Sequence, residues 1–274
     1  MSTVYDVAVV GSRGFLGFAI AAALSARGAD VGGFTKERPF TGGARVVVWA
    51  AGHVTPADTA AGDQALADLT GLVDIAQHSA HPMHVILLSS GGAVYGPPAT
   101  APYSESDQPS PVNDYGRIKL AEEALLAQSG IVHTVLRVAN PYGPGQLGGT
   151  QGVLGAWLTA IRAGQPVTVF GDGSAIRDYV FIDDLASAVA ITAERCPGGV
   201  INVGSGEGTS LAHLLDIVTA AAAPHHLEVH REPPRGVDPP AAWLDVARAR
   251  EVLGWTATTP LTEGVARTWA AVSA

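Results

Sequence analysis

The feature that most constrains the fold is a glycine-rich turn that lies directly between a strand-like run and a helix-like run. Residues 4–10 are rich in valine, and residues 15–27 have the alanine and leucine content of a helix that Gly28 ends. Three glycines between them follow the spacing Gly-x-x-Gly-x-x-Gly: Gly11, Gly14 and Gly17. Such a turn lets the backbone approach a pyrophosphate, and the start of the helix offers it unpaired N–H groups. In this context a dinucleotide site is favoured over a turn without a ligand.

Strand-like and helix-like segments alternate along the chain. We expect strands at residues 4–10, 30–34, 45–51, 84–90, 132–138 and 167–170. We expect helices at residues 15–27, 63–79, 113–129, 152–163 and 183–194. This alternation predicts an α/β fold with a doubly wound parallel sheet. The connection from Phe34 to Arg45 is too short for a further strand and helix, so one edge of the sheet should be shortened.

The composition of the chain changes after residue 140, where the turn-forming residues proline and glycine become frequent. We therefore expect two parts. Residues 1–140 and 177–203 should form the dinucleotide-binding domain, because the helix at 183–194 returns to the sheet. Residues 141–176 and 204–274 should form a smaller mixed substrate-binding lobe.

Composition excludes several classes of function. The formal net charge of -9 argues against a nucleic-acid partner. No apolar run reaches the ~20 residues of a membrane helix, so we expect no membrane partner. The single Cys196 cannot form an internal disulfide, which favours a cytoplasmic location.

Histidines and acidic pairs do not indicate a metal site. His78, His81 and His84 are spaced across a helix end and a proline, so they cannot share one helical face. Asp183 and Asp184 open a helix, where carboxylates satisfy backbone donors. We expect no metal.

A tyrosine and a lysine lie one helical turn apart in the segment Tyr-Gly-Arg-Ile-Lys, at Tyr115 and Lys119. A tyrosine with its ordinary pKa of about 10 is a poor acid or base at neutral pH. The nearby ammonium favours the phenolate, and it can also hold a ribose. Such a tyrosine can take a proton from a sugar hydroxyl and return it. Alone the pair is weak evidence, but the glycine turn upstream strengthens it.

With these motifs the chain resembles the extended short-chain dehydrogenase/reductases, in the nucleotide-sugar epimerase/dehydratase branch. The resemblance covers nearly the whole chain and implies a Rossmann sheet. Its ordered segments are Gly11–Gly17, Ser89–Gly96, Tyr115–Lys119, Arg137–Gly145, Gly171–Asp184, Asn202–Ser210 and Asp245–Trp255.

The resemblance implies roles for individual residues. The catalytic residues would be Tyr115, Lys119 and Ser90. The cofactor NAD or NADP would contact Gly11, Ser12, Arg13, Gly14, Phe15, Leu16, Gly17, Thr35, Lys36, Ala51, Ser89, Tyr115, Lys119 and Pro141. The substrate, a UDP- or dTDP-linked nucleotide sugar, would contact Ser90, Asn140, Arg177 and Arg235. The two arginines match those that grip the diphosphate in UDP-sugar epimerases.

The choice between NAD and NADP stays open. An NAD site usually places an acidic side chain at the end of the second strand, where this chain has Thr35. Arg13, Lys36 and Arg38 would favour the 2′-phosphate of NADP. They can equally be ordinary solvated charges.

The chain also departs from the family pattern. Gly91 stands where the family usually has the catalytic serine or threonine, so Ser90 or a water would have to act instead. Neither the acid nor the base of a 4,6-dehydratase follows Ser90, which excludes that reaction.

Three functions therefore compete. The first is a nucleotide-sugar 4-epimerase that uses bound NAD(P), with Tyr115 as acid and base. The second is an NADPH-dependent 4-keto-sugar reductase, and the third is a non-catalytic dinucleotide-binding protein. Retention of Tyr115 and Lys119 speaks against the third. The resemblance also implies a homodimer formed by the helices at 63–79 and 113–129.

Overall fold

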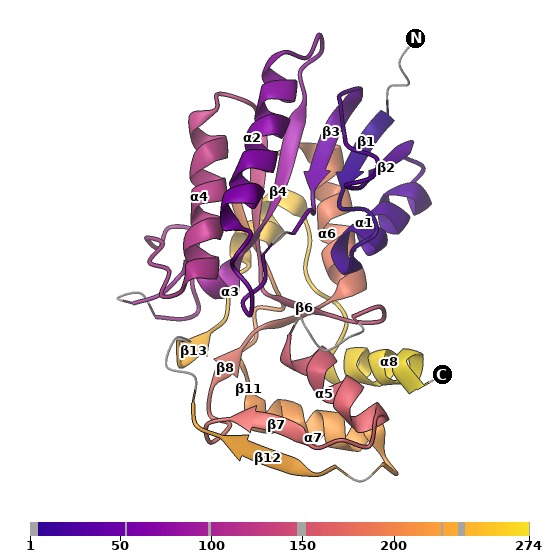
Figure 1. Cartoon of the computed structure of the whole chain (residues 1–274), viewed down its shortest axis with the longest axis vertical. Coiled ribbons are helices and arrows are strands. Elements are labelled where there is room, and N and C mark those ends of the chain that lie inside the picture. The colour runs from indigo at the N-terminus through magenta and orange to yellow at the C-terminus, as the bar shows by residue number, and fades with distance from the viewer. Residues whose placement is uncertain are drawn as a thin grey trace.

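The structure is a computed structural model that describes residues 5–52, 54–97, 100–146, 152–225, 227–234 and 239–273. Its largest part is a six-stranded sheet with helices on both faces (Figure 1). In spatial order the strands are β10 (Gly199–Val203), β5 (His133–Val138), β4 (His84–Ser90), β3 (Ala44–Trp49), β1 (Tyr5–Val10) and β2 (Val31–Phe34). The helices of this part are α1 (Phe15–Ala26), α2 (Gly62–Gln77), α3 (Gly91–Val94), α4 (Asp114–Gln128) and α6 (Ile182–Arg195).

Every neighbouring pair of strands in this sheet is parallel, which confirms the predicted doubly wound Rossmann sheet. The strand β2 forms one edge and pairs with β1 through the register Val7 to Val31. The chain then passes directly from β2 to β3 on the other side of β1. The short connection after Phe34 thus removes a strand from this edge, as expected.

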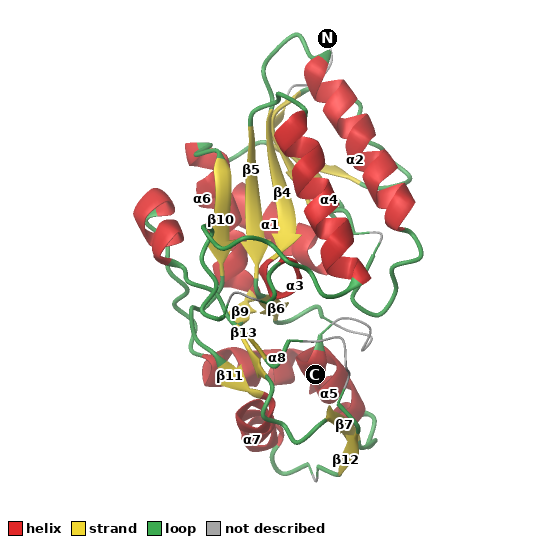
Figure 2. Ribbon diagram, turned by 90° about the vertical axis from the view of Figure 1, so that its left-hand side faces the viewer, coloured by secondary structure: helices red, strands yellow, loops and turns green. Residues whose placement is uncertain are grey.

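Alternating side chains of the buried strands build two hydrophobic layers, because successive residues of a strand point to opposite faces. On one face, Val7 and Val9 of β1 pack in a cluster with Ile20 of α1. On the other face, Ala8 lies in a cluster with Leu69 of α2. Figure 2 shows α2 and α4 side by side over one face of the sheet.

The remaining elements form small sheets and helices next to the carboxyl ends of the large sheet, in the lower part of Figure 1. The small sheets pair β6 (Asn140–Tyr142) with β9 (Tyr179–Phe181), β7 (Val167–Phe170) with β12 (Val229–Glu232), and β8 (Ile176–Arg177) with both β11 (Thr209–Ser210) and β13 (Ala241–Ala242). The helices of this part are α5 (Val153–Arg162), α7 (Leu211–Ala222) and α8 (Leu261–Ser273), whereas a π-helical turn at Ala249–Leu253 packs against α6 and β10 of the large sheet.

The exact division into two domains stays a prediction. The positions of β10 and α6 support it, since β10 completes the large sheet and α6 packs against α1. Within the described ranges, no helix has the length and apolar character needed to cross a bilayer.

Candidate active site

A cavity of about 900 Å³ opens at the carboxyl ends of β1, β2 and β3. Its volume falls in the usual range for small-molecule sites. Six of the residues predicted to bind the cofactor line it: Gly11, Arg13, Gly14, Thr35, Lys36 and Ala51. The other predicted cofactor residues, Tyr115 and Lys119 among them, are not among its lining residues, and contact of any of these residues with a cofactor stays a prediction.

The glycine turn at the edge of this cavity depends on the absence of side chains. Gly11 has a φ of +90°, and a Cβ there would lie 2.6 Å from the Ala50 carbonyl oxygen. A Cβ on Gly17 would collide with the carbonyl oxygen of Gly11. These two glycines let α1 start close to the ends of the strands.

The amino end of α1 is suited to bind an anion. Its N-cap, Gly14, makes no side-chain capping hydrogen bond, and its first turn contains no acidic residue. The first N–H groups of a helix have no partners inside the helix, so they attract negative charge. This end fits the pyrophosphate of a dinucleotide. Among the other predicted contacts, Ser12 donates its hydroxyl hydrogen to the Phe34 carbonyl at 3.3 Å.

An acidic residue that the sequence analysis missed lies at the edge of the same cavity. Glu37 accepts a hydrogen bond of 2.7 Å from Thr35, and its carboxylate lies 3.8 Å from Arg13. The hydrogen bond from Thr35 is the main cause that lowers the pKa of Glu37. A carboxylate therefore accompanies the cations Arg13 and Lys36. No local pattern distinguishes Glu37 from other exposed acidic residues.

The predicted tyrosine and lysine lie on α4, which packs against β4. Asn113 caps this helix by accepting a 2.8 Å hydrogen bond from the Gly116 N–H. Tyr115 is half-buried. Lys119 is buried, and its ammonium donates to Glu122 at 2.9 Å and to the Leu88 carbonyl of β4 at 3.5 Å.

Burial and the neighbouring acidic groups act in opposite directions on the charge of Lys119. Burial is the largest single influence and disfavours the charge, but the acidic groups of Tyr115, Glu122 and Glu123 together outweigh it and raise the pKa of Lys119. The amine thus stays charged at neutral pH.

The two serines at the end of β4 differ in their surroundings. Ser89 is buried, and its hydroxyl donates to Glu123 at 2.5 Å, so this hydroxyl hydrogen is not available for the predicted cofactor contact. Ser90 is half-buried at the start of α3. A Cβ on Gly91 would lie 2.7 Å from Leu244 and 3.1 Å from the Arg137 carbonyl oxygen. Close packing thus explains the glycine at 91.

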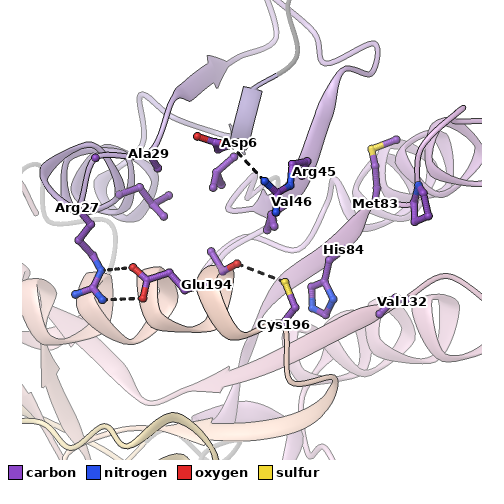
Figure 3. A pocket seen from close by; sticks show the side chains of 15 residues that line it. Asp6, Arg27, Ala29, Arg45, Val46, Met83, His84, Val132, Glu194 and Cys196 are labelled. Carbon is purple, nitrogen blue, oxygen red and sulfur yellow. Dashed lines mark hydrogen bonds and ion pairs between the residues drawn. The ribbon is translucent and has the colours of Figure 1, made fainter.

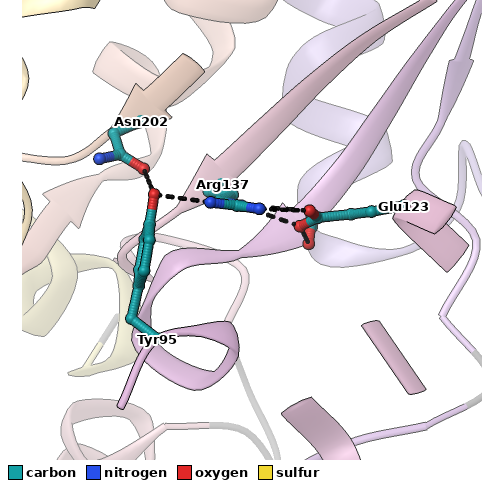
Figure 4. Close-up of polar contacts among 5 residues, drawn as sticks. Tyr95, Glu123, Arg137 and Asn202 are labelled. Carbon is teal, nitrogen blue, oxygen red and sulfur yellow. Dashed lines mark hydrogen bonds and ion pairs between the residues drawn. The ribbon is translucent and has the colours of Figure 1, made fainter. Parts of the chain in front are cut away.

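A buried polar network stabilises this edge of the sheet (Figure 4). Arg137 of β5 donates to Glu123 of α4 at 2.7 Å and to the Tyr95 hydroxyl at 2.8 Å. Tyr95 in turn donates to Asn202 of β10 at 2.9 Å. The network therefore joins the helix that carries Tyr115 to strands β5 and β10.

Asp178 connects the large sheet to the small ones. Its backbone carbonyl accepts hydrogen bonds from the backbone and the side chain of Asn140, at 3.0 and 2.8 Å. Its buried carboxylate accepts from Ser205, Gly206 and Leu244. Burial is the main influence on Asp178 and raises the pKa of its carboxyl group. Asp178 thus fixes the position of Asn140.

The remaining predicted contacts come from the small sheets. Pro141 is half-buried in β6, and its carbonyl accepts a 3.1 Å hydrogen bond from Gln146. Arg177 is half-buried in β8 and donates to the Ile176 carbonyl at 2.7 Å. Arg235 lies outside the described residues.

The carboxylates at the start of α6 have a different role from the expected one. We expected Asp183 and Asp184 to satisfy backbone donors of their own helix. Instead Asp183 accepts from Arg267 at 2.6 Å, and Asp184 accepts from Thr258 and Thr259, both at 2.9 Å. They tie α6 to the C-terminal segment. Within the described part of the chain no group of three or more His, Cys, Asp or Glu side chains could hold a metal ion.

A second cavity, of about 490 Å³, lies at the amino ends of the strands, away from the glycine turn (Figure 3). An ion pair of Arg27 with Glu194, at 2.6 Å, and one of Arg45 with Asp6, at 3.8 Å, flank it. Ligands of parallel α/β sheets bind outside the carboxyl ends of the strands. This position therefore excludes the second cavity as the predicted dinucleotide site.

Known proteins share both the sequence and the architecture. The model of the NAD dependent epimerase/dehydratase family matches residues 39–204. A UDP-glucose 4-epimerase of Mycolicibacterium smegmatis is 40% identical over 67% of this chain, and the chain spans 60% of that protein's length. A dTDP-6-deoxy-L-talose 4-dehydrogenase (NAD(P)(+)) of Kitasatospora kifunensis is 33% identical over 97% of this chain and 95% of its own length.

The fold agrees with these matches. A UDP-glucose 4-epimerase of Thermus thermophilus, solved in complex with NAD, superposes with a TM-score of 0.86. That structure is 27% identical and covers 97% of this chain and 98% of its own. The glycine turn and the Tyr115–Lys119 pair predicted this relationship, and the full-length superposition confirms it. The chain belongs to the NAD-dependent epimerase/dehydratase family.

Proposed function

We propose that the chain is a nucleotide-sugar 4-epimerase. The observation that carries the proposal is the buried ammonium of Lys119, which lies one helical turn from Tyr115 on the same helix, α4. This pair lies on α4 against β4, and β4 is the neighbour of β3, whose carboxyl end lines the large cavity. The UDP-glucose 4-epimerases among the relatives support the same reaction.

The cavity and the glycine turn fit a dinucleotide, so we assign its binding to them. Gly11, Gly14 and the uncapped start of α1 would hold the pyrophosphate, and Thr35 and Ala51 would contact the adenosine half. A bound NAD would supply the acceptor for a hydride from a sugar carbon and the donor for its return.

The residues of the chain would transfer the proton and bind the sugar. Tyr115 takes the proton of the C4 hydroxyl and returns it to the opposite epimer, while Lys119 stabilises its phenolate. Ser90, at the carboxyl end of β4, would hydrogen-bond the same oxygen. Asn140, held by Asp178, would line the sugar site.

The direct test uses UDP-galactose as the probe, with NAD and without a reductant. We expect interconversion with UDP-glucose, followed by NMR of the anomeric protons, and no net formation of NADH. Absence of interconversion at saturating cofactor would contradict the proposal.

A 4-ketoreductase is the second candidate, because the dehydrogenase of Kitasatospora kifunensis matches over 95% of its length. This activity would consume NADPH in proportion to a 4-keto-sugar probe. Cofactor binding without exchange at C4 would instead indicate a non-catalytic protein.

Replacement of Arg177 by alanine is expected to raise the KM for the UDP-sugar by about 10-fold or more, with little change in kcat. We assign this arginine to the substrate diphosphate, and a charge-assisted hydrogen bond contributes about 1.5–3 kcal/mol. Steady-state kinetics measure the effect. Arg162→Ala is the matched control, because Arg162 is an exposed arginine on α5. A fall in kcat at unchanged KM would remove Arg177 from the diphosphate site.

Replacement of Glu37 by glutamine is expected to shift the ratio of the dissociation constants of NADP and NAD by about 5-fold toward NADP. The carboxylate would repel a 2′-phosphate, and it lies 3.8 Å from Arg13, which could bind one. Calorimetric titration of both cofactors measures the ratio. Glu232→Gln, on the exposed strand β12, is the control. An unchanged ratio would show that Glu37 does not discriminate between the cofactors.

Other parts of the proposal concern assembly and location. We propose a homodimer through α2 and α4, a cytoplasmic location and a UDP- or dTDP-linked substrate. The packing of α2 along α4 supports the dimer, because it places the two helices together on one face. A monomer in light scattering at working concentration would contradict it.

A further inference from the structure

Glu122 is a buried carboxylate for which the proposed reaction has no use. Its side chain is 1% exposed and lies on α4, one turn after Lys119. Its carboxylate oxygen accepts the Lys119 ammonium at 2.9 Å. A buried charge needs a partner, so this contact holds both groups in place.

The charges around Lys119 are balanced before Tyr115 ionises. Lys119 and Arg137 are positive, and Glu122 and Glu123 form the ion pairs with them at 2.9 and 2.7 Å. These four side chains carry no net charge. Ionisation of Tyr115 would therefore add an uncompensated negative charge to a buried group of side chains.

Four elements pack against α4. Among the described residues, none of them contributes an ionisable side chain that is bonded to Lys119. The strand β4 contributes the Leu88 carbonyl, and β5 contributes Arg137, which is held by Glu123. On α2, Asp63 and Asp74 are exposed, and Asp68 accepts a hydrogen bond from Gln64. Near α3, Tyr95 is bonded to Arg137.

We propose that Glu122 is a positioning residue that neutralises Lys119 and thereby sets the pH at which Tyr115 acts as a base. This inference rests on the proposed function of Tyr115. With Glu122 in place, the ammonium gives the phenolate only part of its stabilisation, so Tyr115 stays protonated to higher pH. Glu122 also draws Lys119 toward its own side of α4, which fixes where the ammonium lies relative to Tyr115.

The variant Glu122→Gln tests this, because glutamine keeps the size and the acceptor oxygen but removes the charge. The measurement is tyrosinate absorbance as a function of pH. From each titration curve we subtract that of the same protein carrying Tyr115→Phe, so the difference reports Tyr115 alone. We expect the Tyr115 midpoint to move down by on the order of one pH unit. Asp74→Asn, an exposed carboxylate on α2, should leave the midpoint in place.

The outcomes separate this inference from the proposed function. An unchanged midpoint in folded Glu122→Gln would overturn the inference and give Glu122 a structural role only. A lowered midpoint without any epimerase activity would support the inference and count against the proposed reaction. If Glu122→Gln does not fold, Glu122→Asp retracts the carboxylate from Lys119 and should still lower the midpoint, by less than half as much. A fixed midpoint there would equally overturn the inference.

Discussion

Tyr115→Phe is expected to lower turnover by about 100-fold or more, while the affinity for NAD changes by less than about twofold. Phenylalanine keeps the ring but removes the hydroxyl that takes the proton from the sugar. Lys119 and Glu122 remain bonded to each other, so the fold of α4 should persist. Turnover is measured with UDP-galactose, and NAD affinity by calorimetry.

The control for this variant is Tyr5→Phe. Tyr5 lies at the start of β1, the opposite end from the glycine turn, and its hydroxyl accepts from the exposed Arg38 at 3.0 Å. Turnover of this control should stay close to that of the parent protein. Full turnover of Tyr115→Phe would remove the tyrosine from the mechanism, and a matching loss in Tyr5→Phe would indicate a general effect on folding.

The large sheet could be predicted because its local signals agree with the tertiary structure. The runs of valine, the glycine turn at residues 11–17 and the short connection after Phe34 each determine their own neighbourhood. They predicted β1, α1 and the shortened edge within one or two residues. The small strands such as β8 and β11, two residues each, have no periodicity to detect.

The polar side chains on the buried face of α4 could not be predicted. Its buried face comprises Gly116, Lys119, Glu122, Glu123 and Leu126. In sequence, adjacent glutamates on a helix indicate a solvated face. Only the packing of α4 against β4 and β5 brings Ser89 and Arg137 to these carboxylates, so the network depends on contacts between distant segments.

For Glu37 and for the start of α6, local sequence likewise did not reveal which residues the side chains contact. Glu37 follows β2 by three residues, and only the course of the loop places it near Arg13. Asp183 and Asp184 have the sequence context of capping residues, yet partners more than 70 residues away bind their carboxylates. A local motif identifies the type of residue that a site needs. It does not identify which of several possible partners that side chain binds in the folded protein.

Glu123→Ala is expected to destabilise the protein by about 3–5 kcal/mol, the cost of breaking a buried ion pair. The variant leaves the guanidinium of Arg137, which is 4% exposed, without the acceptor that it contacts at 2.7 Å. It also removes the acceptor of the buried Ser89 hydroxyl. Equilibrium unfolding in urea measures the change in the free energy of unfolding.

A double variant distinguishes the loss of a partner from the loss of packing. Glu123→Leu combined with Arg137→Met replaces both charges by apolar side chains of similar size, so no buried charge remains unpaired. Such replacements are often neutral or stabilising, and we expect the double variant to be more stable than Glu123→Ala by at least about 2 kcal/mol. Equal instability of the two proteins would show that the hydrogen bond from Ser89, which both variants lose, and the one from Arg137 to Tyr95, which only the double variant loses, outweigh the charge balance. Full stability of Glu123→Ala would mean that water reaches Arg137 and that the network does not stabilise this edge of the sheet.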